Sequence, residues 1–196
     1  RLQKVGDLSW LKENYDFSQV AFSIDELIIL DVSRGDRDEE KFREHVGSLS
    51  EECFIPIAAG GGIRNVEQAR QLLYSGADKI VVNSLLSKNE DVIEKIAFEF
   101  GWQCLVFSVD VKRTKDGLRC FIENGTVMLN TSLSEYLKDI LLLPIGELYL
   151  NSIDRDGTGQ GYDYDLLDSL PTPMHNPVII AGGAGKDAHL IEGLND

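Results

Sequence analysis

The sequence predicts an α/β fold, a (β/α)8 TIM barrel that is incomplete at both ends and forms a single domain over residues 1–196. Two observations predict βα units: short apolar runs recur roughly every 25 to 30 residues, and a helical pattern separates consecutive runs. A third, an internal repeat, favours a closed barrel. The predicted strands are Leu27–Val32, Phe54–Ala58, Lys79–Asn83, Leu105–Asp110, Leu148–Ser152 and Val178–Ala181.

Each predicted strand is apolar almost throughout, which is typical of parallel strands that are buried on both faces. Apolar residues at helical spacing predict helices in the connections, at Val66–Ser75, Glu90–Phe100 and Leu133–Leu142. Before the first of these, Asn65 is an N-cap candidate and Gln68 completes a predicted capping box. This alternation leaves two architectures open, a doubly wound sheet and a closed barrel.

Two pairs of segments resemble each other at nearly the same separation. DELIILD resembles GELYLNS, which places Glu147 at 147 − 26 = 121 positions after Glu26. IAAGGG resembles IIAGGA, which places Gly182 at 182 − 60 = 122 positions after Gly60. A common offset indicates a duplicated half of about 120 residues, half of a barrel of roughly 250. Chance similarity between buried strands is the alternative.

Six strands are visible, whereas eight are needed to close such a barrel. Only the fifteen residues after Ala181 remain beyond the last predicted strand, enough for a glycine loop and the start of a helix. Residues Arg1–Gly6 are interpreted as the tail of a first strand. We therefore expect the start of strand one and all of strand eight to be absent from this chain.

Charge and composition exclude several classes of function. Thirty-three acidic residues against nineteen basic ones give a net charge of −14, which disfavours nucleic acid as a partner. No apolar run is long enough for a membrane span, and no signal peptide is recognisable. Three scattered cysteines and three scattered histidines show no metal-ligand spacing. A cytoplasmic protein with buried free thiols is predicted.

In such barrels the loops that follow the strands form the active face. Polar residues at these positions are Asp31, Asn83, Asp110 and Asp154. Asp110 ends a largely apolar run, and partial burial at the rim would raise its pKa for acid or base chemistry. The alternative is a structural salt bridge between Asp110 and Lys112 or Arg113.

Two glycine runs follow predicted strands and precede predicted helices, at Gly60–Gly62 and Gly182–Gly185. Backbone N–H groups in such turns can cradle a phosphate at a helix N-terminus. A single run would be explained by a tight turn, whereas two at duplicated positions imply two phosphates or a bisphosphate. A third loop, DRDGTG at Asp154–Gly159, places two acids and a base at the same rim.

Taken together, these segments resemble the cyclase subunit family of imidazole glycerol phosphate synthase. The resemblance covers the whole chain and is carried by DELIILDV, GGGIR, ADKIVVN, SVDVKR, GELYLNSIDRDGTGQGYD and IIAGGAGK. It implies an ammonia-dependent lyase of histidine biosynthesis. Such an enzyme splits and cyclises a bisphosphorylated ribulosyl intermediate into imidazole glycerol phosphate and an aminoimidazole ribotide. The ammonia comes from a glutaminase subunit in a heterodimer, with no cofactor and no metal.

The resemblance also implies roles for individual residues. Asp110 is one of two catalytic aspartates, and the other precedes Arg1. The implied phosphate contacts are Gly61, Gly62, Asn83 and Ser84 at one end and Asp156, Gly157, Gly182 and Gly183 at the other. The implied substrate contacts are Asp31 and Ser152. Three residues match an ammonia gate at strand starts, Glu26, Lys79 and Glu147, although an ion-pair cluster explains them equally well.

The chain departs from the family pattern in three places. Asn151 stands where the family usually has threonine, the usual Thr-Gly pair is blurred within Glu123–Thr131, and the helix near Phe17–Ser23 looks short. These features resemble cyclase paralogues that supply ammonia for sugar amidation in surface-polysaccharide biosynthesis. A non-catalytic, ammonia-channelling partner subunit is a further alternative.

Overall fold

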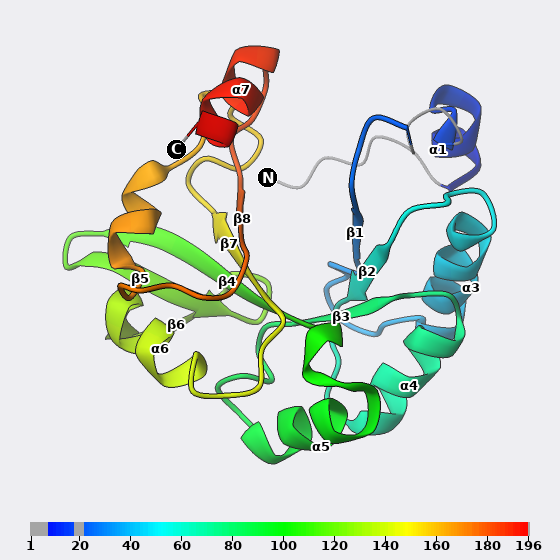
Figure 1. The fold of residues 1–196 in the computed structure, drawn as a ribbon, viewed down its shortest axis with the longest axis horizontal. Coiled ribbons are helices and arrows are strands. Elements are labelled where there is room, and N and C mark those ends of the chain that lie inside the picture. Colours follow the sequence, from blue (N-terminus) through cyan, green and yellow to red (C-terminus); the bar gives the residue numbers. More distant parts are fainter. Residues whose placement is uncertain (1–7, 18–21, 196) are drawn as a thin grey trace.

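The fold is built on one sheet whose parallel strands are covered on their outer side by helices (Figure 1). The computed structural model describes residues 8–17 and 22–195. Six parallel strands lie in the spatial order β1–β2–β3–β4–β7–β8. They are β1 (Leu27–Leu30), β2 (Ile57–Gly60), β3 (Lys79–Val82), β4 (Leu105–Thr114), β7 (Glu147–Ser152) and β8 (Val178–Ala181).

The six strands curve into an open ring, with the gap between β1 and β8 (Figure 1). Within the described residues, no hydrogen-bonded pairing joins these two strands. All six strands predicted from the sequence are confirmed, and they neighbour one another in the order that a barrel requires. The predicted strand tail at Arg1–Gly6 lies outside the described residues, as does most of the predicted short helix near Phe17–Ser23.

The helices predicted at Val66–Ser75, Glu90–Phe100 and Leu133–Leu142 are confirmed, with ends that differ by up to two residues. The described helices are α1 (Leu8–Asn14), α3 (Glu39–Ser50), α4 (Val66–Tyr74), α5 (Glu90–Phe100), α6 (Leu133–Ile140) and α7 (Asp187–Asn195), with 3-10 turns η1 (Trp102–Cys104) and η2 (Tyr164–Ser169). Neither α1 nor α3 was predicted from the sequence; α3 buries only Val46 and Leu49 and so carries a weak apolar stripe.

The predicted cap of α4 is half correct. Asn65 Oδ1 accepts a hydrogen bond from Gln68 N at 2.9 Å, as expected. The Gln68 side chain, however, accepts from Arg64 N rather than from the N-cap itself. The chain forms a complete capping box instead at α6, where Ser132 and Glu135 bond reciprocally.

Two further corrections concern the strands. The second predicted strand begins at Ile57 rather than Phe54, because Pro56 lacks an N–H group and the Phe54 side chain is exposed. An antiparallel hairpin, β5 (Gly117–Ile122) and β6 (Val127–Ser132), extends β4 and was not predicted. Its signal was the Asp116–Gly117 turn, where Gly117 has φ +96°.

The internal repeat is visible in the strand registers. Leu27 pairs with Ile57 and Leu148 pairs with Val178, so 148 − 27 and 178 − 57 both give 121. The glycine turns obey the same shift only if Gly61, rather than Gly60, corresponds to Gly182. Both of these glycines have positive φ. Gly61 lies against the carbonyl oxygen of Asp31, just after β1, and Gly182 lies against that of Ser152, the last residue of β7. The one-residue discrepancy in the sequence offsets is thereby removed.

Apolar side chains form two separate cores. The larger one fills the space between the sheet and the outer helices. A smaller one lies on the inner side of the ring and consists of Ala58, Val81 and Val106, with Ile28 and Tyr149 packed against them. The inner residues come from five neighbouring strands, so they form one layer of a barrel interior.

Candidate active site

The inner face of the sheet carries three layers because side chains alternate along each strand. In β3 and the residue after it, Lys79, Val81 and Asn83 share this face. In β7 the corresponding series is Glu147, Tyr149 and Asn151. Charged residues therefore lie at the strand starts, apolar ones in the middle and amides at the mouth. Lys79 and Asn83 are separated by about 13 Å along the strand.

Asp110 lies at the mouth between the amides of the two neighbouring strands. Its Oδ1 accepts a hydrogen bond from Asn151 Nδ2 at 2.8 Å, and its Oδ2 accepts one from Asn83 Nδ2 at 3.2 Å. The salt bridge to Lys112 or Arg113 that the sequence left open is not formed among the described residues. Arg113 instead pairs with Asp163 and Asp165.

Burial raises the pKa of Asp110 above its ordinary value, and the nearby charge of Asp156 acts in the same direction. The hydrogen bonds from Asn151 and Asn83 oppose this shift. Tyr149 lies below Asp110 on the inner face, and burial together with the charges of Asp110 and Asp156 raises its pKa to about 12. Asp110 is therefore a partly desolvated carboxyl suited to proton transfer.

The charged cluster at the strand starts is made by Lys79, Glu26 and Glu147. Lys79 Nζ donates to Glu26 Oε2 and to Glu147 Oε1, both at 2.6 Å. Burial alone would lower the pKa of Lys79, but the bonds to both glutamates outweigh it and raise the pKa. Glu26 Oε1 and Glu147 Oε2 are buried with no hydrogen-bond partner among the described residues. The cluster could accommodate a further cation or donor.

The two glycine turns lie at the same mouth as Asp110, because they follow β2 and β8 of the same parallel sheet. Their packing by itself requires glycine: a Cβ on Gly61 would overlap the carbonyl of Asp31, and one on Gly182 would overlap that of Ser152. A Cβ on Gly182 would also approach Asn151 Oδ1 to 3.3 Å. Asn151, which donates to Asp110, therefore lies beside the second turn.

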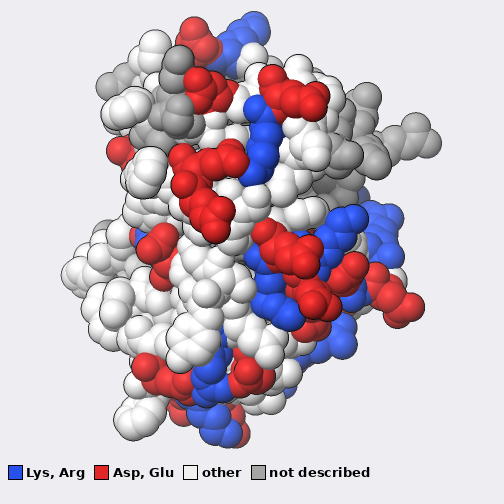
Figure 2. All heavy atoms as spheres, turned by 90° about the vertical axis from the view of Figure 1, so that its right-hand side faces the viewer, with Lys and Arg blue, Asp and Glu red and all other residues white. Residues whose placement is uncertain are grey.

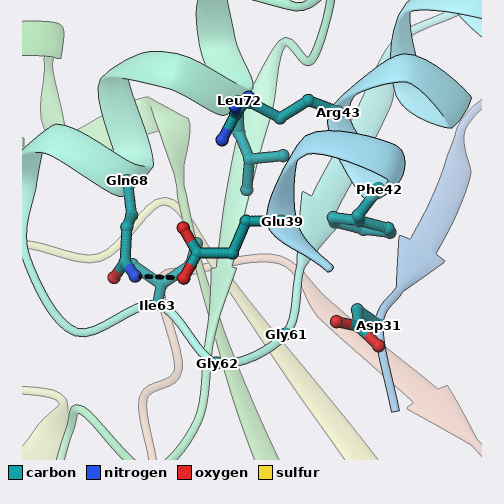
Figure 3. A pocket seen from close by; sticks show the side chains of 9 residues that line it. All are labelled: Asp31, Glu39, Phe42, Arg43, Gly61, Gly62, Ile63, Gln68 and Leu72. Atoms are coloured by element: carbon teal, nitrogen blue, oxygen red, sulfur yellow. Dashed lines mark hydrogen bonds between the residues drawn. The ribbon is translucent and has the colours of Figure 1, made fainter. Parts of the chain in front are cut away.

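Near the first turn, a pocket opens between α3 and α4 (Figure 3). Its lining consists of Asp31, Glu39, Phe42, Arg43, Gly61, Gly62, Ile63, Gln68 and Leu72. Gln68 Nε2 donates to Glu39 Oε1 at 2.7 Å, and the Asp31 carboxylate lies across the pocket from them. The charged side chains of the lining are Asp31, Glu39 and Arg43, so any attraction for an anion must come from the backbone N–H groups of the glycine turn.

Other residues predicted at the site already have partners in the structure. Asp31 pairs with Arg37, and although burial opposes the shift, hydrogen bonds from Ser33 and the Arg37 charge lower the pKa of Asp31. Ser84 Oγ accepts from Glu123 N at 3.1 Å. The buried Ser152 hydroxyl lies on the outer face of β7, 3.3 Å from Asp163 Oδ2.

The DRDGTG loop divides between structure and site. Asp154 Oδ2 accepts from Arg113 N at 2.7 Å and so fastens the loop to β4. Asp156 and Gly157 are exposed on the same loop, and a Cβ on Gly157 would meet no atom within 4 Å. The backbone at Gly157 is therefore open to a ligand, whereas Asp154 serves the fold.

Two contacts at the site were not predicted from the sequence. Asn151 appeared only as a departure from a family pattern, and its position opposite Asp110 follows from the β4–β7 register. Arg37, in a loop with no recognisable motif, lies over the first glycine turn: a Cβ on Gly62 would meet its Nε at 2.7 Å. No local signal points to Arg37, because the contact joins residues far apart in the sequence.

Figure 2 shows acidic and basic side chains interleaved over the face that α1, α3 and α4 cover. Ion pairs of this region include Lys12 with Glu52 and Arg70 with Glu99. This face is of mixed charge rather than a basic surface of the kind that binds nucleic acid. Within residues 8–17 and 22–195, every helix is too short or too polar to span a bilayer.

Fold and site together define a class: an α/β-barrel protein with a desolvated acid among amides at the carboxyl ends of its strands. Comparison with known families gives a match to the histidine biosynthesis protein family over residues 13–196. The chain belongs to this family, whose members are TIM barrels.

Curated relatives agree with the family match. "Putative imidazole glycerol phosphate synthase subunit hisF2" of Parasynechococcus marenigrum is 44% identical over 194 residues, which are 99% of this chain and 72% of that protein. "Imidazole glycerol phosphate synthase subunit HisF" of Chlorobium limicola is 39% identical, with 87% and 68% of the two chains covered. The HisF subunit of Dictyoglomus thermophilum is 36% identical, with 97% and 74% covered.

Proposed function

We propose that this chain is the ammonia-dependent cyclase of imidazole glycerol phosphate synthase, a lyase acting in the cytoplasm on a bisphosphorylated ribulosyl substrate. The observation that carries the proposal is the placement of Asp110, desolvated and amide-bonded, at the mouth that both glycine turns share. The names of the curated relatives support the same activity, and they do not favour the sugar-amidation paralogue.

In this proposal Asp110 transfers protons at the centre of the substrate. Gly61 and Gly62, with Asn83 and Ser84, hold one phosphate. Gly182 and Gly183, with Asp156 and Gly157, hold the other. Peptide N–H groups of the turns supply the attraction, which must overcome a net charge of −14. Asp31 remains a predicted substrate contact, whereas Ser152 would have to turn from the outer face, where it binds Asp163, to reach a substrate at the mouth. Ser84 must exchange its bond with Glu123 for one to the ligand.

The gap between β1 and β8 supports the proposal that the described residues form one domain, an incomplete barrel. Both facing edges carry unpaired backbone groups among the described residues. By the family resemblance, one added strand would carry the second catalytic aspartate. It would also bring an arginine to the charged cluster, where Glu26 Oε1 and Glu147 Oε2 lack partners.

A glutaminase subunit is the proposed source of ammonia, docked at the edge of the sheet where the strands start. Exposed large apolar side chains occupy helix ends and connections along this edge: Phe54, Tyr74, Phe98 and Leu142, between 80% and 95% exposed. Burial of such residues is typical of subunit interfaces. Ammonia would enter at the Lys79 cluster and follow the inner layer toward Asp110.

The decisive experiment is turnover of the ribulosyl substrate with an ammonium salt by the full-length protein, which includes the second catalytic aspartate, alongside substrate and phosphate binding by calorimetry. Asp110→Asn should reduce turnover by roughly 100-fold or more while leaving binding intact. Asp116→Asn, on the exposed hairpin turn, is the matched control and should leave turnover unchanged. Retained turnover in Asp110→Asn would reject its role. A chain that binds neither substrate nor phosphate would reject the cyclase proposal.

A further inference from the structure

Three neighbouring parallel strands bring Asn83, Asp110 and Asn151 into one row at the mouth. Asp110 and Asn151 are direct register partners in β4 and β7, and Asn83 follows β3 on the other side of β4. Each carboxylate oxygen of Asp110 accepts a hydrogen bond from a different amide, at 2.8 Å and 3.2 Å. The two amides therefore grip the carboxylate from opposite sides.

Within the described part of the chain, Asp110 forms no ion pair with a lysine, arginine or histidine. The titratable groups that act on it, or are acted on by it, are Asp156 in the loop after β7, Tyr149 within β7 and Cys120 on β5. None of these groups is positively charged, and the negative charge of Asp156 disfavours ionisation of Asp110. The ionised form of Asp110 therefore depends on the amide donors.

We propose that Asn83 and Asn151 are positioning residues that form an amide clamp, which holds Asp110 ionised and in one orientation so that it serves as a general base. This role rests on the proposed cyclase function. Each amide donates to one carboxylate oxygen, and hydrogen bonds to the charged form favour ionisation, so both amides oppose protonation.

The other end of the Asn151 amide faces the second glycine turn. Its Oδ1 lies near the Gly182 turn while its Nδ2 binds Asp110, so the amide spans the distance from the turn to the carboxylate.

The test is the pKa of Asp110 itself, measured by the pH dependence of its carboxyl 13C resonance in the full chain. Asn151→Leu and Asn83→Leu keep side-chain size but remove the donor, and each should raise the Asp110 pKa by about one pH unit. Asn176→Leu is the matched control: Asn176 donates to Ile145 O at the other end of the sheet, and its loss should leave the Asp110 pKa unchanged.

Unchanged Asp110 pKa values in both clamp variants would overturn the proposal. If a leucine variant fails to fold, the corresponding alanine variant takes its place. The resonance reports on the clamp whether or not the chain turns over substrate, so a failed cyclase assay does not affect this readout. In active protein, the acidic limb of the pH–rate profile should move upward with the pKa, which a merely structural role for the amides would not cause.

Discussion

Lys79→Met should destabilise the protein by about 2–4 kcal/mol at pH 7, because it leaves two largely buried carboxylates facing each other. Lys79 makes two bonds of 2.6 Å to Glu26 and Glu147, and all three side chains are less than one fifth exposed. Removing one partner of a buried pair typically costs 3–5 kcal/mol. Protonation limits the cost: a glutamic acid with a pKa of about 4.3 takes up a proton at pH 7 for about 3.7 kcal/mol.

That limit makes the cost dependent on pH. In Lys79→Met the folded cluster holds a proton that the unfolded chain releases above about pH 4.3, so the variant loses stability as pH rises. The difference from the wild type should therefore shrink by up to about 1.4 kcal/mol per pH unit between pH 7 and about pH 4.3. Urea unfolding followed by far-ultraviolet circular dichroism at pH 7 and pH 5 measures both quantities.

Two controls separate charge from packing. Lys88→Met breaks the exposed ion pair with Glu123 and should cost no more than about 0.5 kcal/mol. Adding Glu26→Gln and Glu147→Gln to Lys79→Met removes the uncompensated charge and should recover most of the loss. A cost below about 1 kcal/mol at pH 7, or one that is the same at pH 5, would refute the reasoning.

Three further predictions are read from the same unfolding assay. Gly61→Ala and Gly182→Ala should each cost about 2 kcal/mol or more, since their Cβ atoms would overlap backbone at positive φ, whereas Gly157→Ala, in open space, should cost about 1. Asp31→Asn should destabilise at pH 7, and because the folded pKa is lowered, the difference should fade as pH drops below 3.8; a constant gap would contradict this. Ser132→Ala removes the α6 cap and should cost about 1 kcal/mol without altering phosphate binding.

The repeat shows how much can be read from one sequence when neighbouring residues carry the signal. Buried parallel strands are apolar over consecutive positions, so all six were found, and the matched glutamates and glycines identified the duplication. Whether Gly60 or Gly61 corresponds to Gly182 depends on strand register, which the sequence offsets did not resolve.

By itself the sequence determined the class of fold and the face that carries the glycine turns, because periodicity and turn chemistry are local. It placed Asp110 at the end of a strand, whereas β4 continues to Thr114 by pairing with β5. Only the tertiary structure decided what lies beside Asp110. Asn83 and Asn151 are 27 and 41 positions away from it, and hydrogen bonds across parallel strands depend on register and pleat. The same pleat turns Ser152 to the outer face while Asn151 faces the mouth. Successive side chains of a strand point to opposite faces, and the sequence motif does not show which residue points inward.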